Sequence, residues 1–176
     1  FEASFAYHFG LRKPVVAAIN GPAAGVGLVL ACFADIRFSI PGVKLTTAHG
    51  KLNFPAEYGL SWLLPRLIGL PRANDLLLTS RVILSDEAFE IGLVNRLIPP
   101  EQLMAETYDY ARQMIDSVSP ASLRETKWQI YTDLHRDVGS AVRASEALID
   151  TMSRHKDYQE GVSAFLEKRK PNWTGK

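Results

Sequence analysis

The chain has 176 residues, of which 47% are hydrophobic, and its formal net charge is +1. This size is sufficient for one domain with a buried core and a helical appendage, and the near-neutral charge gives no electrostatic basis for binding nucleic acid. No apolar stretch reaches the roughly 18 residues of a membrane-spanning helix, and a single cysteine, Cys32, excludes an internal disulfide. We therefore expect a soluble, cytoplasmic protein without nucleic-acid or membrane partners.

The N-terminal segment predicts the end of a helix, a buried strand and a tight turn that leads into a second helix. Residues 1–9 are typical of the tail of a helix, and the apolar run at 15–19 is typical of a buried strand. The turn at 20–28 is rich in small residues, and residues 28–33 continue as a short helix. We interpret Cys32 on this helix as a small core residue rather than a catalytic thiol, because no histidine is near it in sequence.

The turn at 20–28 has the composition of an anion-binding element. It reads Asn-Gly-Pro-Ala-Ala-Gly-Val-Gly-Leu, so Gly25 and Gly27 allow a sharp bend and the close approach of a ligand, while Ala24 keeps the wall thin. The first N–H groups of the following helix have no acceptors within that helix and can face an oxyanion. The alternative is a tight turn that only allows close packing of the helix on the strand.

The middle of the chain predicts two more strands and two buried helices. Such an alternation of strands and helices is typical of an α/β fold. Strands are expected at 35–40 and 43–47. A helix at 57–68 is apolar on most sides, and Pro65 is expected to kink it or to end its first half. Another buried helix is expected at 70–79.

A further short helix and strand complete this region. Ser85 is a favourable N-cap, and Asp86 and Glu87 in the first turn complement the positive end of the helix dipole. Gly92 is expected to stop the helix before a strand at 93–98.

From Pro100 onward the sequence contains only helix signals. Residues 101–118 carry apolar side chains at a spacing of three and four, and Ser119 and Pro120 provide the N-cap and first position of the next helix. The same apolar spacing recurs at 138–152. Each of these helices is expected to bury one face against a neighbour.

Several segments occur in an order that matches a known family. They are Lys-Pro-Val-Val-Ala-Ala-Ile-Asn-Gly-Pro-Ala-Ala-Gly-Val-Gly-Leu at 13–28, Ala-Asp-Ile-Arg-Phe at 34–38, Trp-Leu-Leu-Pro-Arg-Leu-Ile-Gly at 62–69, Ser-Asp-Glu-Ala with Gly-Leu-Val within 85–94, and Glu-Gly-Val-Ser-Ala-Phe-Leu-Glu-Lys-Arg at 160–169. Together they resemble the enoyl-CoA hydratase/isomerase (crotonase) family over nearly the whole chain.

The resemblance implies a crotonase-like α/β fold. Residues 1–98 would form a spiral of strand-turn-helix repeats, and residues 99–176 a helical oligomerisation region. In the family, further repeats and a motif of the type Ala-Phe-Ser-Ala-Gly-Ala-Asp precede the strand at 15–19, and this motif is absent here. We therefore expect a truncated spiral, the C-terminal part of a crotonase-like protein. Because the helical region packs between subunits in the family, a homo-trimer or a dimer of trimers is implied.

The resemblance also implies a chemistry. Family members act on acyl-CoA, with coenzyme A as part of the substrate and no separate cofactor, and backbone N–H groups hold the thioester carbonyl. Val26 would supply one of these N–H groups. In the hydratase subgroup two glutamates add water, and the matching positions here are Val29 and His49. An aliphatic side chain cannot hold water, so hydration lacks half of its apparatus.

Glu57 is the carboxylate that the resemblance places at the active site. In the isomerase subgroups an acidic residue lies a few positions before the segment that begins at Trp62, as Glu57 does. We expect Glu57 to carry a proton in enoyl-CoA isomerisation, with enoyl-CoA hydratase and a non-catalytic acyl-CoA-binding or assembly fragment as alternatives. Glu57 could also be an ordinary first-turn residue, and His49 either carries a proton or satisfies backbone groups of its loop.

The remaining expected site residues line the acyl pocket or contact coenzyme A. Phe165 and Lys168 match family positions near the adenine and phosphates, although a basic terminus is also typical of a solvated surface. The other histidines have no partners at metal-ligand spacing, so no metal site is expected. The expected acyl-pocket residues are Ala24, Gly25, Gly27, Val29, Ala48, Leu52, Tyr58 and Trp62.

Overall fold

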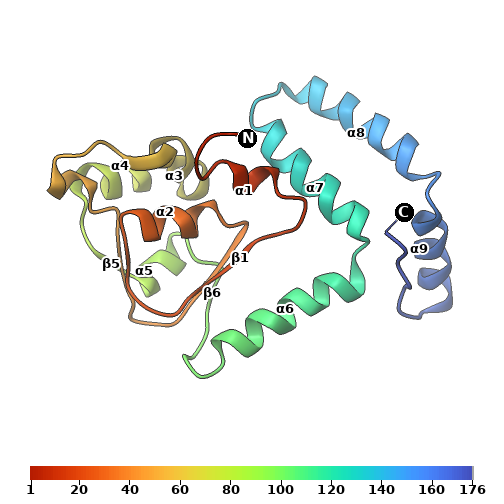
Figure 1. Ribbon diagram of the computed structural model, residues 1–176, viewed down its shortest axis with the longest axis horizontal. Helices are drawn as coiled ribbons and strands as arrows, with labels where there is room; N and C mark the ends of the chain where they lie inside the picture. The colour runs from red at the N-terminus through yellow and green to blue at the C-terminus, as the bar shows by residue number, and fades with distance from the viewer. Residues whose placement is uncertain (176) are drawn as a thin grey trace. The chain divides into compact units, whose positions relative to one another are not determined.

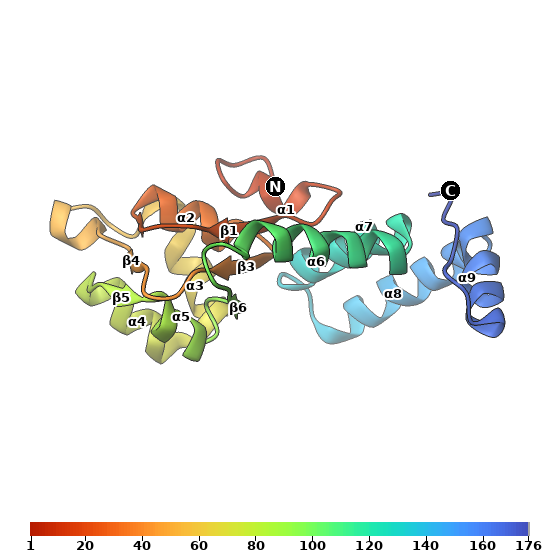
Figure 2. The ribbon, with the colours of Figure 1, turned by 90° about the horizontal axis from the view of Figure 1, so that it is seen from below.

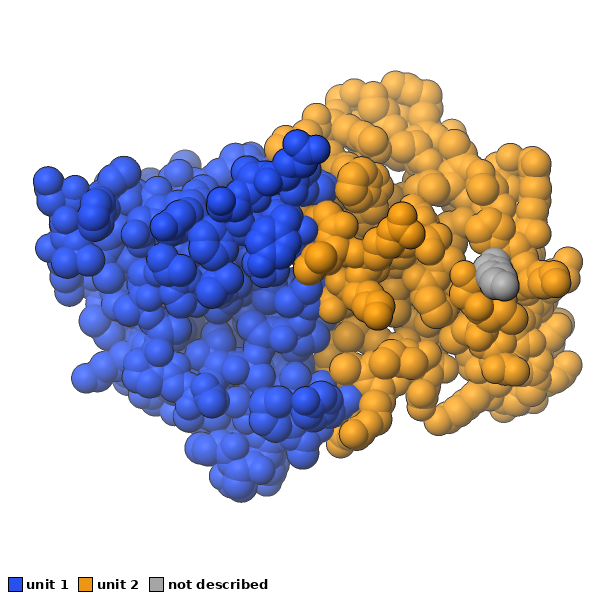
Figure 3. Space-filling model, viewed as in Figure 1, with its two compact units in different colours: residues 1–8, 15–108 blue, residues 9–14, 109–176 orange. Residues whose placement is uncertain are grey.

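The computed structural model describes residues 1–175, which divide into two compact units. Unit 1 comprises residues 1–8 and 15–108, and unit 2 comprises residues 9–14 and the chain from 109 onward (Figure 3). The expected domain division between residues 98 and 99 stays a prediction. Within the described part of the chain, no helix is both long and apolar enough to cross a membrane.

The first of two small sheets in unit 1 is parallel throughout. Its strands, in the order β1-β3-β6, are β1 (Val16–Ile19), β3 (Ile36–Ser39) and β6 (Arg96–Leu97) (Figure 1). Parallel neighbours require a crossover connection, and α2 (Val26–Phe33) lies on the crossover from β1 to β3. The glycine-containing turn is therefore held between a buried strand and the start of a helix.

The second sheet fixes the far side of that turn. Its strands, in the order β2-β4-β5, are β2 (Ala23–Ala24), β4 (Lys44–Thr46) and β5 (Ile83–Leu84). β2 pairs with β4 in parallel, and β4 pairs with β5 antiparallel. The backbone N–H of Gly25 continues the first pairing by donating to the carbonyl of Thr46 at 3.1 Å. The end of β4 thus sets the position of the turn.

Short helices surround these sheets. In the turned view of Figure 2, α2 lies on the opposite side of unit 1 from α4 and α5. The most extensive helix packing in the unit is between α3 and α4. The remaining helical elements of unit 1 are η1 (His49–Leu52), η2 (Glu57–Gly59), α3 (Leu60–Ile68), α4 (Leu70–Thr79) and α5 (Ser85–Glu90).

A buried arginine closes the C-terminal end of α2. Arg37 is 4% exposed, and its Nη1 donates to the carbonyls of Ala31, Cys32 and Ala34 at 3.5, 3.2 and 2.6 Å. Its Nε donates to the carbonyl of Leu93 at 2.7 Å. The carbonyls of Cys32 and Ala34 lie at the C-terminal end of α2, where a helix leaves carbonyls without partners inside the helix. The positive charge of Arg37 there complements the helix dipole.

Cys32 lies beside this arginine in the core. Its side chain is 1% exposed, as expected of a small core residue. Burial raises the pKa of the thiol to about 12, although the charge of Arg37 acts in the opposite direction. The thiolate form is therefore scarce at neutral pH, and the interpretation of Cys32 as a core residue is confirmed.

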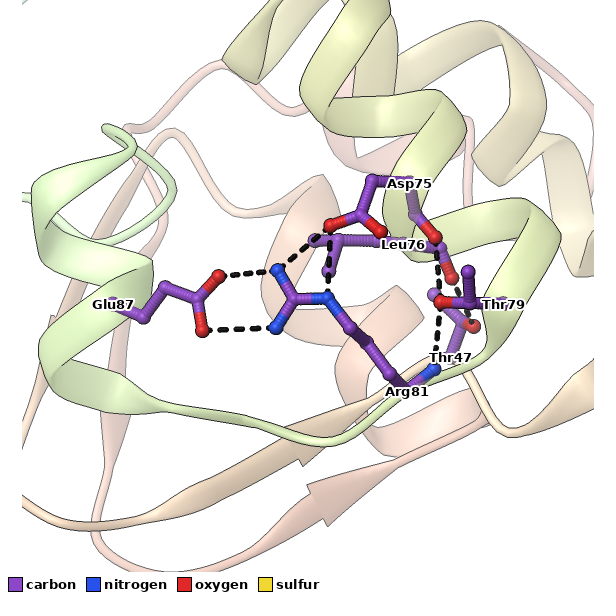
Figure 4. Close-up of polar contacts among 6 residues, drawn as sticks. All are labelled: Thr47, Asp75, Leu76, Thr79, Arg81 and Glu87. Carbon is purple, nitrogen blue, oxygen red and sulfur yellow. Dashed lines mark hydrogen bonds and ion pairs between the residues drawn. The ribbon is translucent and has the colours of Figure 1, made fainter.

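A second arginine joins the end of α4 to α5. Figure 4 shows the guanidinium of Arg81 between the carboxylates of Asp75 and Glu87. Its Nε donates to Asp75 at 2.8 Å, and its two Nη groups form a bidentate pair with Glu87. The backbone N–H of Arg81 donates to Thr79 Oγ1 at 3.1 Å, and Thr79 Oγ1 donates to the Asp75 carbonyl at 2.6 Å. The backbone around residue 80 is thus held from both sides.

Three expectations about local structure are wrong. Ser85 is the first residue of α5 rather than its N-cap, because its hydroxyl binds the segment between β3 and β4 instead: it accepts from Val43 N at 3.0 Å and donates to the Ile40 carbonyl at 2.8 Å. The strand expected at 93–98 is shortened to β6, in which Arg96 and Leu97 pair with β3; the N–H groups of Asn95 and Ile98 beside it donate to the carbonyls of Arg37 and Ser39 at 2.8 and 2.9 Å.

The N-terminal helix is the third. Only Tyr7–Gly10 forms a helix, α1, because Phe5 has a left-handed backbone with φ of 63°. The Phe5 ring lies against Tyr58, with 4.6 Å between centroids. Pro65 does not end its helix. It lies within α3, which continues to Ile68 and has Gly69, with φ of 79°, as its C-cap.

Unit 2 contains long helices, as the spacing of apolar residues predicts, but the helix at 138–152 has no buried residue, so the expectation that each helix buries one face is wrong for it. Pro120 stands at the first turn of its helix and Ser119 at the N-cap, as expected, although the Ser119 side chain makes no capping hydrogen bond. The helices that follow unit 1 are α6 (Leu103–Ser117), whose first residues belong to unit 1, α7 (Pro120–Asp133), α8 (Val138–Met152) and α9 (Lys156–Glu167).

The chain after α9 folds back onto that helix. Asp157 is buried and accepts hydrogen bonds from Thr174 N, Thr174 Oγ1 and Gly175 N, each at 2.8 Å. Burial acts to raise the pKa of Asp157, but these hydrogen bonds lower it below its ordinary value. One turn later, Glu160 accepts from both Nη groups of Arg169 at 2.6 and 3.0 Å.

Candidate active site

The turn between β2 and α2 has a backbone that only glycine adopts readily. Gly25 has φ of 50° and ψ of −123°, a region that is unfavourable for residues with a Cβ. Its own N–H is occupied by Thr46, as described above. Val26 is the first residue of α2, so its N–H has no carbonyl one turn earlier in the helix to receive it. The geometry is compatible with the predicted oxyanion donor at Val26, whose role stays a prediction.

The carboxylate of Glu57 lies against this turn. A Cβ built on Gly25 would be 3.5 Å from Glu57 Oε2. Glu57 is partly buried and begins η2, where the next two residues, Tyr58 and Gly59, both have positive φ of 47° and 81°. The backbone therefore bends within η2 and before α3, and the Glu57 carboxylate at its first position lies beside the glycine turn. The structure thus brings together two of the expected site elements, which lie about 30 positions apart in the sequence.

A Gly25→Ala variant tests how much the site depends on this turn. We expect the substitution to destabilise the folded protein by about 1–3 kcal/mol, because alanine is strained at this φ and ψ. The new methyl group would also lie in van der Waals contact with the Glu57 carboxylate. Urea unfolding measures the change, with Gly21→Ala as the control, since a Cβ there would meet no atom within 4 Å and its φ is not positive. Equal stability of both variants would contradict the claim that the backbone at Gly25 requires glycine.

His49 is on a separate loop and is almost completely enclosed. It is 6% exposed, and its Nδ1 has no hydrogen-bond partner among the described residues. It begins η1, whose flanking residues Ala48 and Asn53 both have left-handed backbones, with φ of 59° and 61°. The expected alternative was that the His49 side chain satisfies backbone groups of its loop. Nδ1 does not do so, because it has no hydrogen-bond partner among the described residues. Its role as a proton carrier stays a prediction.

The other expected acyl-pocket residues differ in exposure. Leu52 and Tyr58 are 65% and 49% exposed, whereas Val29 is completely buried beneath the turn. The Val29 side chain therefore belongs to the core of unit 1, and its contact with an acyl group stays a prediction. Trp62 is half-buried and stacks against the guanidinium of Arg66 at 4.0 Å. At the turn itself, Ala24 and Gly27 are exposed, Gly25 is half-buried, and Ala48 on the η1 loop is half-buried.

A cavity of about 410 Å³ lies beside the turn, along β1 and α2. Gly27 is among its lining residues, together with Ala23 and Leu30. Glu57 and His49 do not line it. In the described residues, no group of three or more potential metal ligands is found.

The residues expected to contact coenzyme A belong to unit 2. Phe165 is 82% exposed on α9, and Lys168 follows the helix in a left-handed conformation with φ of 52°. Their contacts with coenzyme A stay predictions.

Two residues important for the geometry of the site gave no signal in the sequence. The carbonyl of Thr46 holds Gly25, and the buried hydroxyl of Ser80 holds the loop that contains His49. A serine at the end of an amphipathic helix is compatible with many roles. Only the tertiary contacts between α4 and η1 reveal this one.

Comparisons with known proteins identify the family of the chain. The family model described as Enoyl-CoA hydratase/isomerase matches residues 3–176. Crotonyl-CoA hydratase of Syntrophomonas wolfei is 36% identical over 166 residues, which cover 94% of this chain and 64% of that protein. The 1,2-epoxyphenylacetyl-CoA isomerase of Escherichia coli is 34% identical over 180 residues, covering 94% and 63%.

A solved structure gives the same result for the fold. The crystal structure of enoyl-CoA hydratase from Bacillus anthracis matches with a TM-score of 0.93 at 32% identity, over 98% of this chain and 66% of that one. The chain spans less than two thirds of the length of both curated relatives. The expected α/β crotonase fold is confirmed, and the chain belongs to the enoyl-CoA hydratase/isomerase (crotonase) family.

Proposed function

We propose that the protein isomerises the double bond of an enoyl-CoA thioester by proton transfer through Glu57. The carboxylate removes a proton from a carbon that is acidified by the thioester, which leaves an enolate. The Val26 N–H stabilises the negative charge on the thioester oxygen. The carboxyl group then returns a proton to another carbon, so one C–H bond breaks, one forms and the double bond moves.

One observation carries this proposal: Glu57 Oε2 lies next to the Gly25 turn, 3.5 Å from the position of a Cβ on that residue. A base must be within reach of the proton that it removes, and the developing oxyanion must lie beside its donors. The closeness of Glu57 to the turn that begins α2 supports both conditions being met by one bound thioester. The chemistry needs no dissociable cofactor, because coenzyme A belongs to the substrate.

Hydration of a 2-enoyl-CoA is the second candidate, because the relative from Syntrophomonas wolfei is named a crotonyl-CoA hydratase. Against it, the position matching one hydratase glutamate is Val29, which is aliphatic and completely buried. The position matching the other is His49. A non-catalytic acyl-CoA-binding or assembly fragment remains a third candidate, which the absence of all turnover would favour.

A direct comparison of the two reactions tests this choice. With the purified protein, we expect hydration of crotonyl-CoA to be at least about a hundredfold slower than isomerisation of a 3-enoyl-CoA, because one of two acid–base groups is missing. Both rates follow from the absorbance of the conjugated thioester. Hydration that equals or exceeds isomerisation would assign the protein to the hydratases.

Assembly and coenzyme A contacts extend the same proposal. A homo-trimer or a dimer of trimers would be built by the helices of unit 2. Their exposed apolar side chains include Ile149, Phe165 and Leu166, at 67%, 82% and 73% exposure. Phe165 and Lys168 would approach the adenine and phosphates of coenzyme A. The cytoplasmic location stays a prediction.

A further inference from the structure

Ser80 has a backbone conformation that is unusual for a serine. It is the C-cap of α4, has φ of 47° and ψ of 32°, and is only 1% exposed. Left-handed backbone is disfavoured for residues with a Cβ, and glycine is the ordinary occupant of a helix C-terminus of this kind. A serine at this position, unlike glycine, brings a hydroxyl that can form a compensating hydrogen bond.

The hydroxyl of Ser80 provides that interaction by binding the loop after β4. Its Oγ accepts from the backbone N–H of Gly50 at 3.0 Å and lies 3.4 Å from Thr47 Oγ1. The carbonyl of Ser80 accepts from Thr46 Oγ1 at 3.1 Å. The same residue thus holds both ends of a five-residue loop, 46–50, with His49 next to one of the anchored positions.

This loop connects the two parts of the candidate site. His49 lies in it with its Nδ1 enclosed and without a partner in the described part of the chain. At the other end of the loop, the carbonyl of Thr46 receives the N–H of Gly25, against which the Glu57 carboxylate lies. A shift of the loop would therefore move His49 and the oxyanion turn together.

Hydrogen bonds flank Ser80 on both sides. Thr79 and Arg81 on either side are fixed by hydrogen bonds, and Arg81 lies between the carboxylates of Asp75 and Glu87 (Figure 4). The helical hydrogen bonds of α4 extend to Ser80, whose N–H donates to the Leu76 carbonyl at 3.1 Å. Thr47 Oγ1 lies 3.3 Å from that carbonyl and 3.4 Å from Ser80 Oγ, so its single hydroxyl proton is donated to one or the other, and either bond attaches the loop to the end of α4.

We propose that Ser80 is a positioning residue for the acid–base site: its hydroxyl holds the loop that carries His49. Its carbonyl accepts from Thr46 Oγ1 and so holds the residue whose own carbonyl receives the N–H of Gly25. This inference rests on the proposed function for its effect on turnover. Its geometric content, the control of His49 by Ser80, can be measured without turnover.

Ser80→Gly separates positioning from stability. Glycine removes the hydroxyl but relieves the left-handed backbone, so we expect the urea midpoint of unfolding to stay close to that of the unaltered protein. We expect the NMR signals of the His49 ring to shift or broaden, and kcat for isomerisation to fall at least about tenfold with little change in KM. Unchanged His49 signals in Ser80→Gly would overturn the proposal.

Gly50 offers a second, independent test from the other side of the contact. A Cβ on Gly50 would lie 2.8 Å from Ser80 Oγ, which is too close, and the backbone of Gly50 is not in the left-handed region. Gly50→Ala alone should therefore displace the loop and disturb the His49 signals. Combining it with Ser80→Gly removes the clashing oxygen, so the double variant should unfold at a higher urea concentration than Gly50→Ala. Additive effects of the two substitutions on the urea midpoint would show that Gly50 and Ser80 Oγ are not in contact, which would overturn the proposal.

Ser85→Ala is a matched control for Ser80→Ala. Ser85 also has a buried hydroxyl that accepts from a backbone N–H, that of Val43, but before the start of β4 rather than after its end. Both alanine variants should lose stability, and only Ser80→Ala should change the His49 signals. The same change in both would reduce Ser80 to a structural residue. If the unaltered protein shows no isomerisation, the proposed function fails, while the NMR signals still decide whether Ser80 positions His49.

Discussion

Replacing Glu57 with glutamine should lower the rate of enoyl-CoA isomerisation by at least about a hundredfold, which is within the usual contribution of a general acid–base group. Glutamine keeps the size of the side chain but cannot accept the proton. Because Glu57 is only partly buried and makes no ion pair among the described residues, we expect the fold to tolerate the change. Steady-state turnover with a 3-enoyl-CoA measures the effect.

Glu101→Gln is a suitable control for this substitution. Glu101 is exposed before α6 and lies away from the glycine turn in the sequence, so the same chemical change there should leave turnover unaffected. Retention of more than about a tenth of the turnover in Glu57→Gln would remove Glu57 from the acid–base role.

The largest effect on stability is expected for Arg37→Met. This substitution removes the donors to the carbonyls at the end of α2 and to Leu93, and leaves them in the core without partners. An unsatisfied buried group costs about 1–3 kcal/mol, so we expect the free energy of unfolding to fall by about 3–5 kcal/mol in total. Urea unfolding followed by circular dichroism measures this difference.

The matched control for Arg37 is Arg66→Met. Arg66 is exposed on α3, where it stacks on Trp62 and donates to that residue's carbonyl at 2.7 Å. A surface change of this kind should alter stability by no more than about 0.5 kcal/mol. A loss below about 1 kcal/mol for Arg37→Met would show that the helix end finds other partners.

Local sequence patterns were sufficient to predict helices and strands whose bounds are set by apolar spacing and flanking residues. The helices at 70–79 and 138–152 were predicted with the bounds that the structure has, because their apolar spacing and flanking residues agree. The expected strands at 35–40 and 43–47 were confirmed in shortened form, as Ile36–Ser39 and Lys44–Thr46. Helix α2 begins at Val26, two residues before the expected start at 28.

The errors occurred where a tertiary contact overrides a local preference. Ser85 is a residue type favoured at an N-cap, but its hydroxyl accepts from Val43, which lies just before β4 and is distant in sequence. Pro65 does not end its helix, which begins at Leu60 and continues to Ile68, and a kink at Pro65 stays a prediction. Phe5 bends the N-terminal segment that was expected to be helical.

The candidate site was predictable only in part. The position of Glu57 followed from the family resemblance, but its approach to Gly25 depends on the two positive φ angles at Tyr58 and Gly59, and the one at Tyr58 has no sequence signature. Ser80 was missed for the same reason. Its role depends on contacts with Thr47 and Gly50 that are formed only when α4 meets the loop after β4.

Proton exchange with solvent tests the central claim most directly. In deuterium oxide, the protein should introduce deuterium into an enoyl-CoA at the carbons from which Glu57 removes and to which it returns a proton, and Glu57→Gln should not. Mass spectrometry of the recovered thioester measures the incorporation without depending on the direction of isomerisation. Incorporation by the unaltered protein and its loss in the variant would support the account. Equal incorporation by both proteins would show that another group carries the proton.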